Sequence, residues 1–186
     1  MARACRSALM AVALGSGLAA ISPAALADSG SEGEGVLPVR AIARIHGCTD
    51  SNIVGTAHLI ELPSTEGVKV VEVEMVVRGL PEGLHGVHIH AVGACEPCAA
   101  AMGHFDPGPS GNTSPDGNHP FHSGDLVNLQ VNRNGAGHLS TKTSRITLSA
   151  GPLSVFDADG SAIIVHVSPD TYCPEGAAAG CAGGAR

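Results

Sequence analysis

The sequence predicts an all-β fold, either a sandwich or a barrel built from many short strands. Residues 68–77 (VKVVEVEMVV) largely alternate apolar and polar side chains, which is typical of a strand with one buried face. Turn-forming residues separate the apolar stretches, and Asn134-Gly135 predicts the tight turn of a hairpin. No stretch combines the length and the caps of a convincing helix.

The other expected elements are short strands around one long loop. A turn at residues 81–83 leads into a β-branched stretch at residues 87–90. Residues 91–123 are rich in Gly, Pro, Ser, Asn and Asp and show no periodicity, and a loop of this length is usually functional or disordered. The chain after residue 168 is loop-like again. The remaining expected strands cover residues 39–45, 53–61, 126–131, 138–148 and 162–167.

The first 27 residues have the layout of a secretory signal peptide. Arg3 and Arg6 precede an apolar stretch over residues 8–21, and Ala25-Leu26-Ala27 is a small-x-small cleavage pattern. The alternative is an uncleaved anchor helix, but the apolar stretch is short and interrupted by Gly15-Ser16-Gly17. We therefore predict an exported protein located in the periplasm, in the cell envelope or outside the cell.

After the signal peptide, we expect a disordered leader over residues 28–37 and one domain over residues 38–186. Removing residues 1–27 changes the formal net charge from −7 to −9, because two arginines and no acidic residues are lost. So acidic a chain is a poor candidate for binding nucleic acid, and no later segment is apolar enough to span a membrane. Five cysteines remain, an odd number that leaves at least one without an intrachain partner: Cys48, Cys95, Cys98, Cys173 and Cys181.

The histidines carry the clearest chemical signal. His88 and His90 flank one residue of an expected strand, so their side chains point to the same face and can share a metal ion. His166 lies in a second apolar strand, and His104 opens the segment His-Phe-Asp-Pro in the long loop. His122 and Asp125 stand three residues apart. Each of these features is weak alone, but an imidazole-rich set of this kind suits copper and zinc.

At these residues the sequence resembles the copper/zinc superoxide dismutases. Residues 79–90 (GLPEGLHGVHIH) resemble a signature of that family, residues 104–107 (HFDP) its loop motif, and residues 122–126 (HSGDL) its following motif. Val165-His166 resembles the strand that supplies the last copper ligand. The resemblance covers about residues 38–186. It implies a Greek-key β-sandwich or flattened barrel of the immunoglobulin-like type, with two long functional loops.

The resemblance also assigns roles to individual residues. It makes His88, His90, His104 and His166 the copper ligands, with His104 also bridging to zinc and carrying a proton. His122 and Asp125 become zinc ligands, and Asp170 a carboxylate that joins the two sites through ligand histidines. Arg186 becomes the arginine that attracts superoxide, and His85 a structural residue. The remaining histidines match no ligand and are expected at the surface: His46, His58 and His138.

The zinc site departs from the family pattern. The family places a histidine and a glycine-rich run before the motif of residues 122–126, whereas this chain has NTSPDGNHPFH over residues 112–122. His119 serves as the third zinc histidine if the loop shifts. Otherwise the zinc site is degraded, with only three of its four usual protein ligands.

The C-terminal part departs as well. Family members continue with a short cysteine-containing strand that closes the sheet, and the present sequence stops at Arg186. We therefore expect an open sheet edge, residues 182–186 without ladder partners, a mobile Arg186 and poor turnover of superoxide. We also expect a disulfide between Cys173 and Cys181, or from either to Cys48, Cys95 or Cys98.

Three functions remain open at this point. The first is dismutation of superoxide to dioxygen and hydrogen peroxide at the histidine-bound copper. The second is copper binding or buffering on the same fold with little or no turnover. The third is a purely structural, adhesive or regulatory sandwich, which requires that the histidines do not converge. The sequence does not determine the oligomeric state.

Overall fold

The computed structural model describes residues 2–4, 37–108, 119–173 and 180–186. The predicted signal peptide and leader therefore lie outside the described residues, apart from Ala2–Ala4 and Leu37. Within the described ranges the secondary structure is almost entirely β, and no helix is long and apolar enough to cross a membrane. The prediction of an all-β fold is confirmed.

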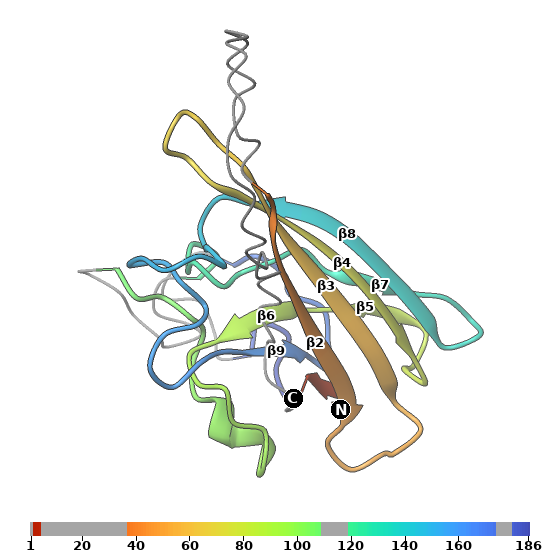
Figure 1. Ribbon diagram of the computed structural model, residues 1–186. Coiled ribbons are helices and arrows are strands. Elements are labelled where there is room, and N and C mark those ends of the chain that lie inside the picture. Colours follow the sequence, from red (N-terminus) through yellow and green to blue (C-terminus); the bar gives the residue numbers. More distant parts are fainter. Residues whose placement is uncertain (1, 5–36, 109–118, 174–179) are drawn as a thin grey trace, which may run out of the picture.

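The strands form one antiparallel sheet with the order β5-β7-β8-β4-β3-β2-β1-β9-β6 (Figure 1). A short 3-10 helix, η1 (Cys98–Ala101), lies in the long loop after β6. The strands are β1 (Ala2–Ala4), β2 (Val39–Gly47), β3 (Val54–Leu62), β4 (Val70–Arg78), β5 (Gly83–His85), β6 (Val87–His90), β7 (Leu129–Val131), β8 (Ala136–Thr143) and β9 (Ala162–Val165).

The sheet curls on itself because its two ends belong to one stretch of chain. β5 and β6 are separated only by Gly86, and β5 pairs with β7 whereas β6 pairs with β9. A single extended segment therefore connects both ends of the strand order, which gives the flattened barrel that the resemblance implies. The long sheet of β2, β3, β4 and β8 faces the shorter strands β6 and β9 across the core (Figure 1).

The predicted strands are found, with bounds that shift by a few residues in either direction: β2 continues to Gly47, whereas β7 and β8 are shorter at one end than expected. β7 begins at Leu129 rather than at residue 126, because the backbone N–H of Asn128 donates to the Tyr172 hydroxyl (2.9 Å) instead of a strand. β8 ends at Thr143, whose hydroxyl accepts the N–H of Arg145 at 3.1 Å. The turn expected at residues 81–83 already contains the first residue of β5.

The expected open edge is not found among the described residues. β1 lies between β2 and β9 and pairs antiparallel with both, with Ala2 opposite Gly47 and Val165. This strand belongs to the segment predicted to be a signal peptide, whose removal stays a prediction.

The main apolar core lies between the layers, and a smaller second cluster consists of Cys95, Ala101, Ala162 and Ile164. The inward positions of the alternating strands supply the main core, as the burial pattern of β4 shows, and Phe105 from the long loop joins them. Leu59, Met75 and Ile146 are at most 2% exposed. Burying each such side chain contributes about 1.5–3 kcal/mol. This core provides the rigid base from which the loop histidines are held.

A buried carboxylate attaches the loop after β8 to β3. Glu61 Oε2 accepts the backbone N–H groups of Leu148 (2.6 Å) and Ser149 (2.9 Å), and Oε1 lies 3.0 Å from Lys69 Nζ. Burial alone would raise the pKa of Glu61, but the hydrogen bonds from Ser149, Lys69 and Leu148 outweigh burial and hold that pKa below its ordinary value. The ionised carboxylate therefore stabilises the fold.

We expect Glu61→Gln to lower the free energy of unfolding by about 2 kcal/mol at neutral pH, since hydrogen bonds to a charged acceptor are lost. Because the folded pKa is depressed, this stabilisation is complete above the unfolded value near 4.5 and is lost as the pH falls through the folded pKa. Urea unfolding between pH 7 and pH 3 checks both effects. Glu72→Gln, which removes the exposed Lys142 pair, serves as control and should cost about 0.5 kcal/mol. Equal losses in the two variants would contradict this role of Glu61.

Candidate metal centre

The strand β6 presents two histidines to one side of the barrel. All four of its residues are buried, and His88 and His90 share a face because side chains alternate along a strand. β9 pairs with one edge of β6, and isolated bridges from His88 to Asp125 and from His90 to His104 line the other edge. The long loop is thus held against the strand that carries the His-x-His pair.

A tight backbone contact fixes that loop. Ile89 donates to the carbonyl of Gly124 (2.8 Å) and accepts the N–H of Phe105 (2.8 Å), and Gly124 donates to the Phe105 carbonyl (2.8 Å). A Cβ at position 124 would lie 2.2 Å from the Ile89 carbonyl oxygen, so only glycine fits there. The glycine of the segment HSGDL therefore brings His104, His122 and Asp125 up to β6.

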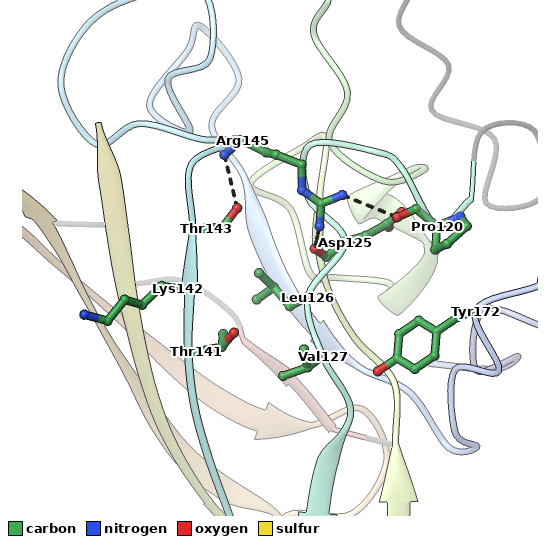
Figure 2. Close-up of a pocket in the computed structure, with 9 residues that line it drawn as sticks. All are labelled: Pro120, Asp125, Leu126, Val127, Thr141, Lys142, Thr143, Arg145 and Tyr172. Carbon is green, nitrogen blue, oxygen red and sulfur yellow. Dashed lines mark hydrogen bonds between the residues drawn. The ribbon is translucent and has the colours of Figure 1, made fainter. Parts of the chain in front are cut away.

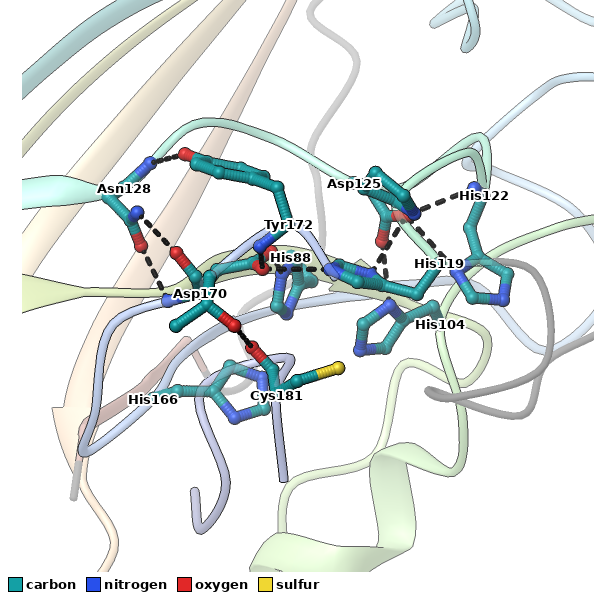
Figure 3. A network of polar contacts seen from close by, with 12 residues as sticks. His88, His104, His119, His122, Asp125, Asn128, His166, Asp170, Tyr172 and Cys181 are labelled. Atoms are coloured by element: carbon teal, nitrogen blue, oxygen red, sulfur yellow. Dashed lines mark hydrogen bonds and ion pairs between the residues drawn. The ribbon is translucent and has the colours of Figure 1, made fainter. Parts of the chain in front are cut away.

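Four histidines converge as the sequence predicted. One ligand nitrogen from each of His88, His90, His104 and His166 lies within 4.8 Å of the other three, and all four side chains are buried. Figure 3 shows three of these rings, those of His88, His104 and His166, with Asp125 bonded to His104. The third class of function, a sandwich whose histidines do not converge, is thereby ruled out.

The ring nitrogens that face away from this cluster are held by acceptors. His88 Nε2 donates to Asp170 Oδ2 (2.8 Å), and the Nδ1 atoms of His90 and His166 donate to the carbonyls of Met102 (2.8 Å) and Gly184 (2.9 Å). With those protons fixed, the inward nitrogens His88 Nδ1, His90 Nε2 and His166 Nε2 are lone-pair donors with no hydrogen-bond partner in the described structure. Imidazole nitrogens arranged in this way suit copper among the ions that bind imidazole.

Burial keeps the rings of His90, His104 and His166 neutral. It lowers the pKa of His104 to about 4, against the opposing effect of Asp125, and it lowers the pKa of His166 to about 3, with the neighbouring His88 adding to the shift. Burial also holds the pKa of His90 well below its ordinary value. Neutral imidazole is the form that binds a metal, so the cluster is competent to do so at neutral pH.

A second cluster shares His104 and lies beside the first. His104 Nδ1 is 2.6 Å from Asp125 Oδ1, while His122 Nδ1 and His119 Nδ1 lie 3.1 and 3.3 Å from Asp125 Oδ2. Burial acts to raise the pKa of Asp125, but contacts with His104 and His122 outweigh it and hold that pKa far below its ordinary value. Three imidazoles and one ionised carboxylate match the donor set of a four-coordinate zinc site. The ligand atoms of His88, His104, His119 and Asp125 all lie within 4.8 Å of one another, and His122 adjoins this group through its contact with Asp125.

The structure answers the question that the altered loop left open. His119 is 1% exposed, and its ring centroid lies 6.2 Å from that of His122. Its Nε2 donates to Asp170 Oδ1 at 2.7 Å, which leaves Nδ1 facing Asp125. His119 therefore lies beside Asp125, where it can serve as a third zinc histidine. We refer to His104, His119, His122 and Asp125 as the zinc corner, and to His88, His90, His104 and His166 as the copper corner.

Asp170 joins the two corners, as the resemblance predicted. Its carboxylate points toward both corners, with Oδ2 contacting His88 and Oδ1 contacting His119 (Figure 3). Sequence reasoning missed the residue that holds Asp170 in place: Asn128 accepts the Asp170 N–H at Oδ1 and donates to the Asp170 carbonyl, both at 2.8 Å. No pattern in the sequence marks this contact, because it joins a strand end to a loop 42 residues away.

The predicted mobility of Arg186 is wrong. Val167 donates to the Ala185 carbonyl (2.9 Å) and Ser168 to that of Gly183 (3.1 Å), so residues 182–186 do have backbone partners. The Arg186 guanidinium donates to the carbonyls of Cys98 (3.3 Å), Ala99 (3.2 Å) and Met102 around η1. The error arose because these acceptors are backbone groups, which a sequence pattern does not reveal.

The disulfide prediction is confirmed in part. Cys173 bonds to Cys181, as expected, and a second disulfide joins Cys48 after β2 to Cys98 at the start of η1. Cys95 is buried. Two disulfides are typical of an exported protein. The surface assignments also hold, because His46, His58 and His138 are exposed, whereas His85 is buried between the carbonyls of His166 and Pro81.

Known proteins are similar to this chain in sequence and in fold. The family model described as copper/zinc superoxide dismutase (SODC) matches residues 53–186. "Superoxide dismutase [Cu-Zn]" of Deinococcus radiodurans is 37% identical over 134 residues, which cover 64% of this chain and 68% of that protein. The protein of the same name from Mycolicibacterium paratuberculosis is 34% identical over 122 residues, 58% of this chain and 48% of that one. A crystal structure of the clock protein EA4 is similar with a TM-score of 0.55 at 26% identity, over 72% of this chain and 78% of that one.

Proposed function

The chain belongs to the copper/zinc superoxide dismutase family, and on that premise we propose that it converts superoxide to dioxygen and hydrogen peroxide at a copper ion in the copper corner. The observation that carries the proposal is the convergence of four buried imidazoles whose outward nitrogens are held by acceptors. Copper, when bound, supplies the electron transfer: it oxidises one superoxide to dioxygen and reduces a second, which leaves as hydrogen peroxide after taking up two protons.

We assign proton transfer to His104. Its Nε2 faces the copper corner, and its Nδ1 faces the zinc corner beside Asp125. The anionic carboxylate favours the protonated ring, and burial favours the neutral ring, so the two effects oppose each other at one imidazole. Burial prevails and lowers the pKa of His104 to about 4, so a proton taken up at Nε2 is readily delivered to a substrate oxygen.

We assign attraction of the anionic substrate to Arg186. The chain is acidic overall, so a cation must act locally to draw superoxide in. The three carbonyls around η1 hold the guanidinium on the side of Met102, whose carbonyl also orients His90. Arg186 is therefore tied to the same loop as a residue of the copper corner. This anchoring removes the mobility of Arg186 as a reason for expecting poor turnover.

We infer that zinc occupies the zinc corner and has a structural role. His104, His119, His122 and Asp125 would hold it, and Asp170 would orient His119 from outside. We also infer export to the periplasm, the cell envelope or the exterior, which agrees with the two disulfides and with the predicted signal peptide.

The test is to purify the exported protein, remove metal, restore copper and zinc, and measure both binding and superoxide turnover. We expect one copper per chain and catalytic turnover, and we expect His166→Ala to abolish the turnover because the copper corner loses a ligand. His138→Ala changes an exposed histidine that pairs with Glu74 and should leave activity unchanged. Stoichiometric copper without turnover would overturn this function and support the copper-buffering alternative.

A further inference from the structure

The side chain of an arginine outside both corners forms hydrogen bonds with the segment that carries the zinc ligands. Arg145 follows the end of β8, and its guanidinium donates through Nη1 to the Pro120 carbonyl (3.3 Å) and through Nη2 to the Asp125 carbonyl (Figure 2). Pro120 comes directly after His119, and Asp125 is itself in the zinc corner. One side chain thus connects both ends of residues 119–125, which supply three of the four residues of that corner.

The two ends of this segment are restrained unequally by the rest of the protein. At its second half, Gly124 is bonded to Ile89 and Phe105, and the Ser123 N–H and hydroxyl both lie 3.3 Å from Asp106 Oδ1. In the described part of the chain, the hydrogen bond from Arg145 is the one that attaches the backbone of residues 119–121 to the β barrel. The position of His119 therefore depends on Arg145 and on its own contacts with two carboxylates.

The guanidinium lies at the edge of a cavity of about 310 Å³ on the outer side of this segment, between Arg145 and Tyr172 (Figure 2). Arg145 is exposed, and its own backbone is fixed independently by the Thr143 hydroxyl. If the side chain is shortened, water from this cavity can reach the two carbonyls, so the fold should survive the substitution. The substitution would then change the position of residues 119–121 and leave the packing of the core intact.

We propose that Arg145 is a positioning residue for zinc: it sets the separation of His119 from Asp125 and thereby tunes zinc affinity far more than copper affinity. The inference rests on the proposed zinc site. It is selective because His90 and His166 are oriented by the carbonyls of Met102 and Gly184, on loops that Arg145 does not contact in the described structure. Lysine cannot replace it fully, because one ammonium group lacks the planar fork that spans two carbonyls.

The experiment uses metal-free full-length protein and titrates it with zinc against a chelator, with Co²⁺ as a spectroscopic probe of the same corner. We expect Arg145→Ala to weaken zinc binding about 10- to 100-fold, the usual effect of losing an outer partner, and Arg145→Lys to fall between. The cobalt absorption bands should shift in Arg145→Ala. Copper affinity and the unfolding midpoint of the metal-free protein should stay close to those of the unsubstituted chain.

Arg133→Ala is the matched control, since Arg133 is an exposed arginine that pairs with Glu82 (3.4 Å) away from both corners. Unchanged zinc affinity in Arg145→Ala would overturn the proposal, and so would an equal loss of copper affinity. Superoxide turnover is not used as a readout, so an inactive but zinc-binding protein would refute the proposed activity while leaving this role intact. Failure of the unsubstituted protein to bind zinc or cobalt would refute the zinc corner itself.

Discussion

Replacing His119 with alanine is expected to remove zinc from the protein while leaving copper bound. His119 is one of three imidazoles around Asp125, and its other nitrogen is fixed by Asp170. Loss of a direct ligand should exceed the 10- to 100-fold loss of affinity that is typical of an outer partner. Metal analysis after dialysis against a chelator, with copper and zinc measured on the same sample, checks the result.

His58→Ala is the control for this substitution, because His58 is an exposed histidine on β3 that faces Glu74 on the neighbouring strand. It should retain both metals. The assignment fails if His119→Ala keeps zinc as tightly as His58→Ala does. It also fails if copper and zinc are lost together to the same extent, since His119 belongs to only one corner.

The disulfide between Cys48 and Cys98 should have the largest effect on stability. It closes a loop of 50 residues, and loop closure of that length stabilises a fold by about 4 kcal/mol. We expect the double substitution Cys48→Ser and Cys98→Ser to lower the free energy of unfolding by about that amount. Because η1 begins at Cys98 and its carbonyls hold Arg186, superoxide turnover should fall as well.

The matched comparison is Cys173→Ser with Cys181→Ser, which opens a loop of only eight residues. The same argument gives a smaller loss there, about 2.5 kcal/mol. Chemical unfolding of both double variants and of the unsubstituted protein measures the two losses. If the shorter loop costs as much stability as the longer one, or if the Cys48/Cys98 variant is as stable as the parent, the argument does not hold.

The parts predictable from the sequence are those governed by local periodicity. Alternation along residues 68–77 predicted β4, and the same alternation placed His88 and His90 on one face. The role of His119 was left open, because a loop without periodicity does not specify which side chain reaches a distant carboxylate. Cysteine spacing likewise does not encode pairing, so the bond between Cys48 and Cys98 was not predicted.

The expectation for Arg186 failed for a different reason. It assumed that a chain end without a strand partner is mobile, whereas Gly183 allows the backbone to run close beside His166. With φ at +88°, this residue adopts a conformation that favours glycine, and a Cβ there would lie 2.7 Å from the His166 Cβ. The glycines near the C-terminus were interpreted as loop, although one of them permits the contact that fixes the last residues.

The two corners are joined twice, through the ring of His104 and through the carboxylate of Asp170. Ions bound at the two corners therefore cannot be independent. By thermodynamic linkage, the factor by which bound zinc changes the affinity for copper equals the factor by which bound copper changes the affinity for zinc. A coupling free energy of 1–3 kcal/mol corresponds to a change in affinity of about 5- to 150-fold. The order in which the ions arrive then changes the route but not the final occupancy. Where one of the two metals is scarce, the protein therefore binds the first ion more tightly only after the second ion has also bound.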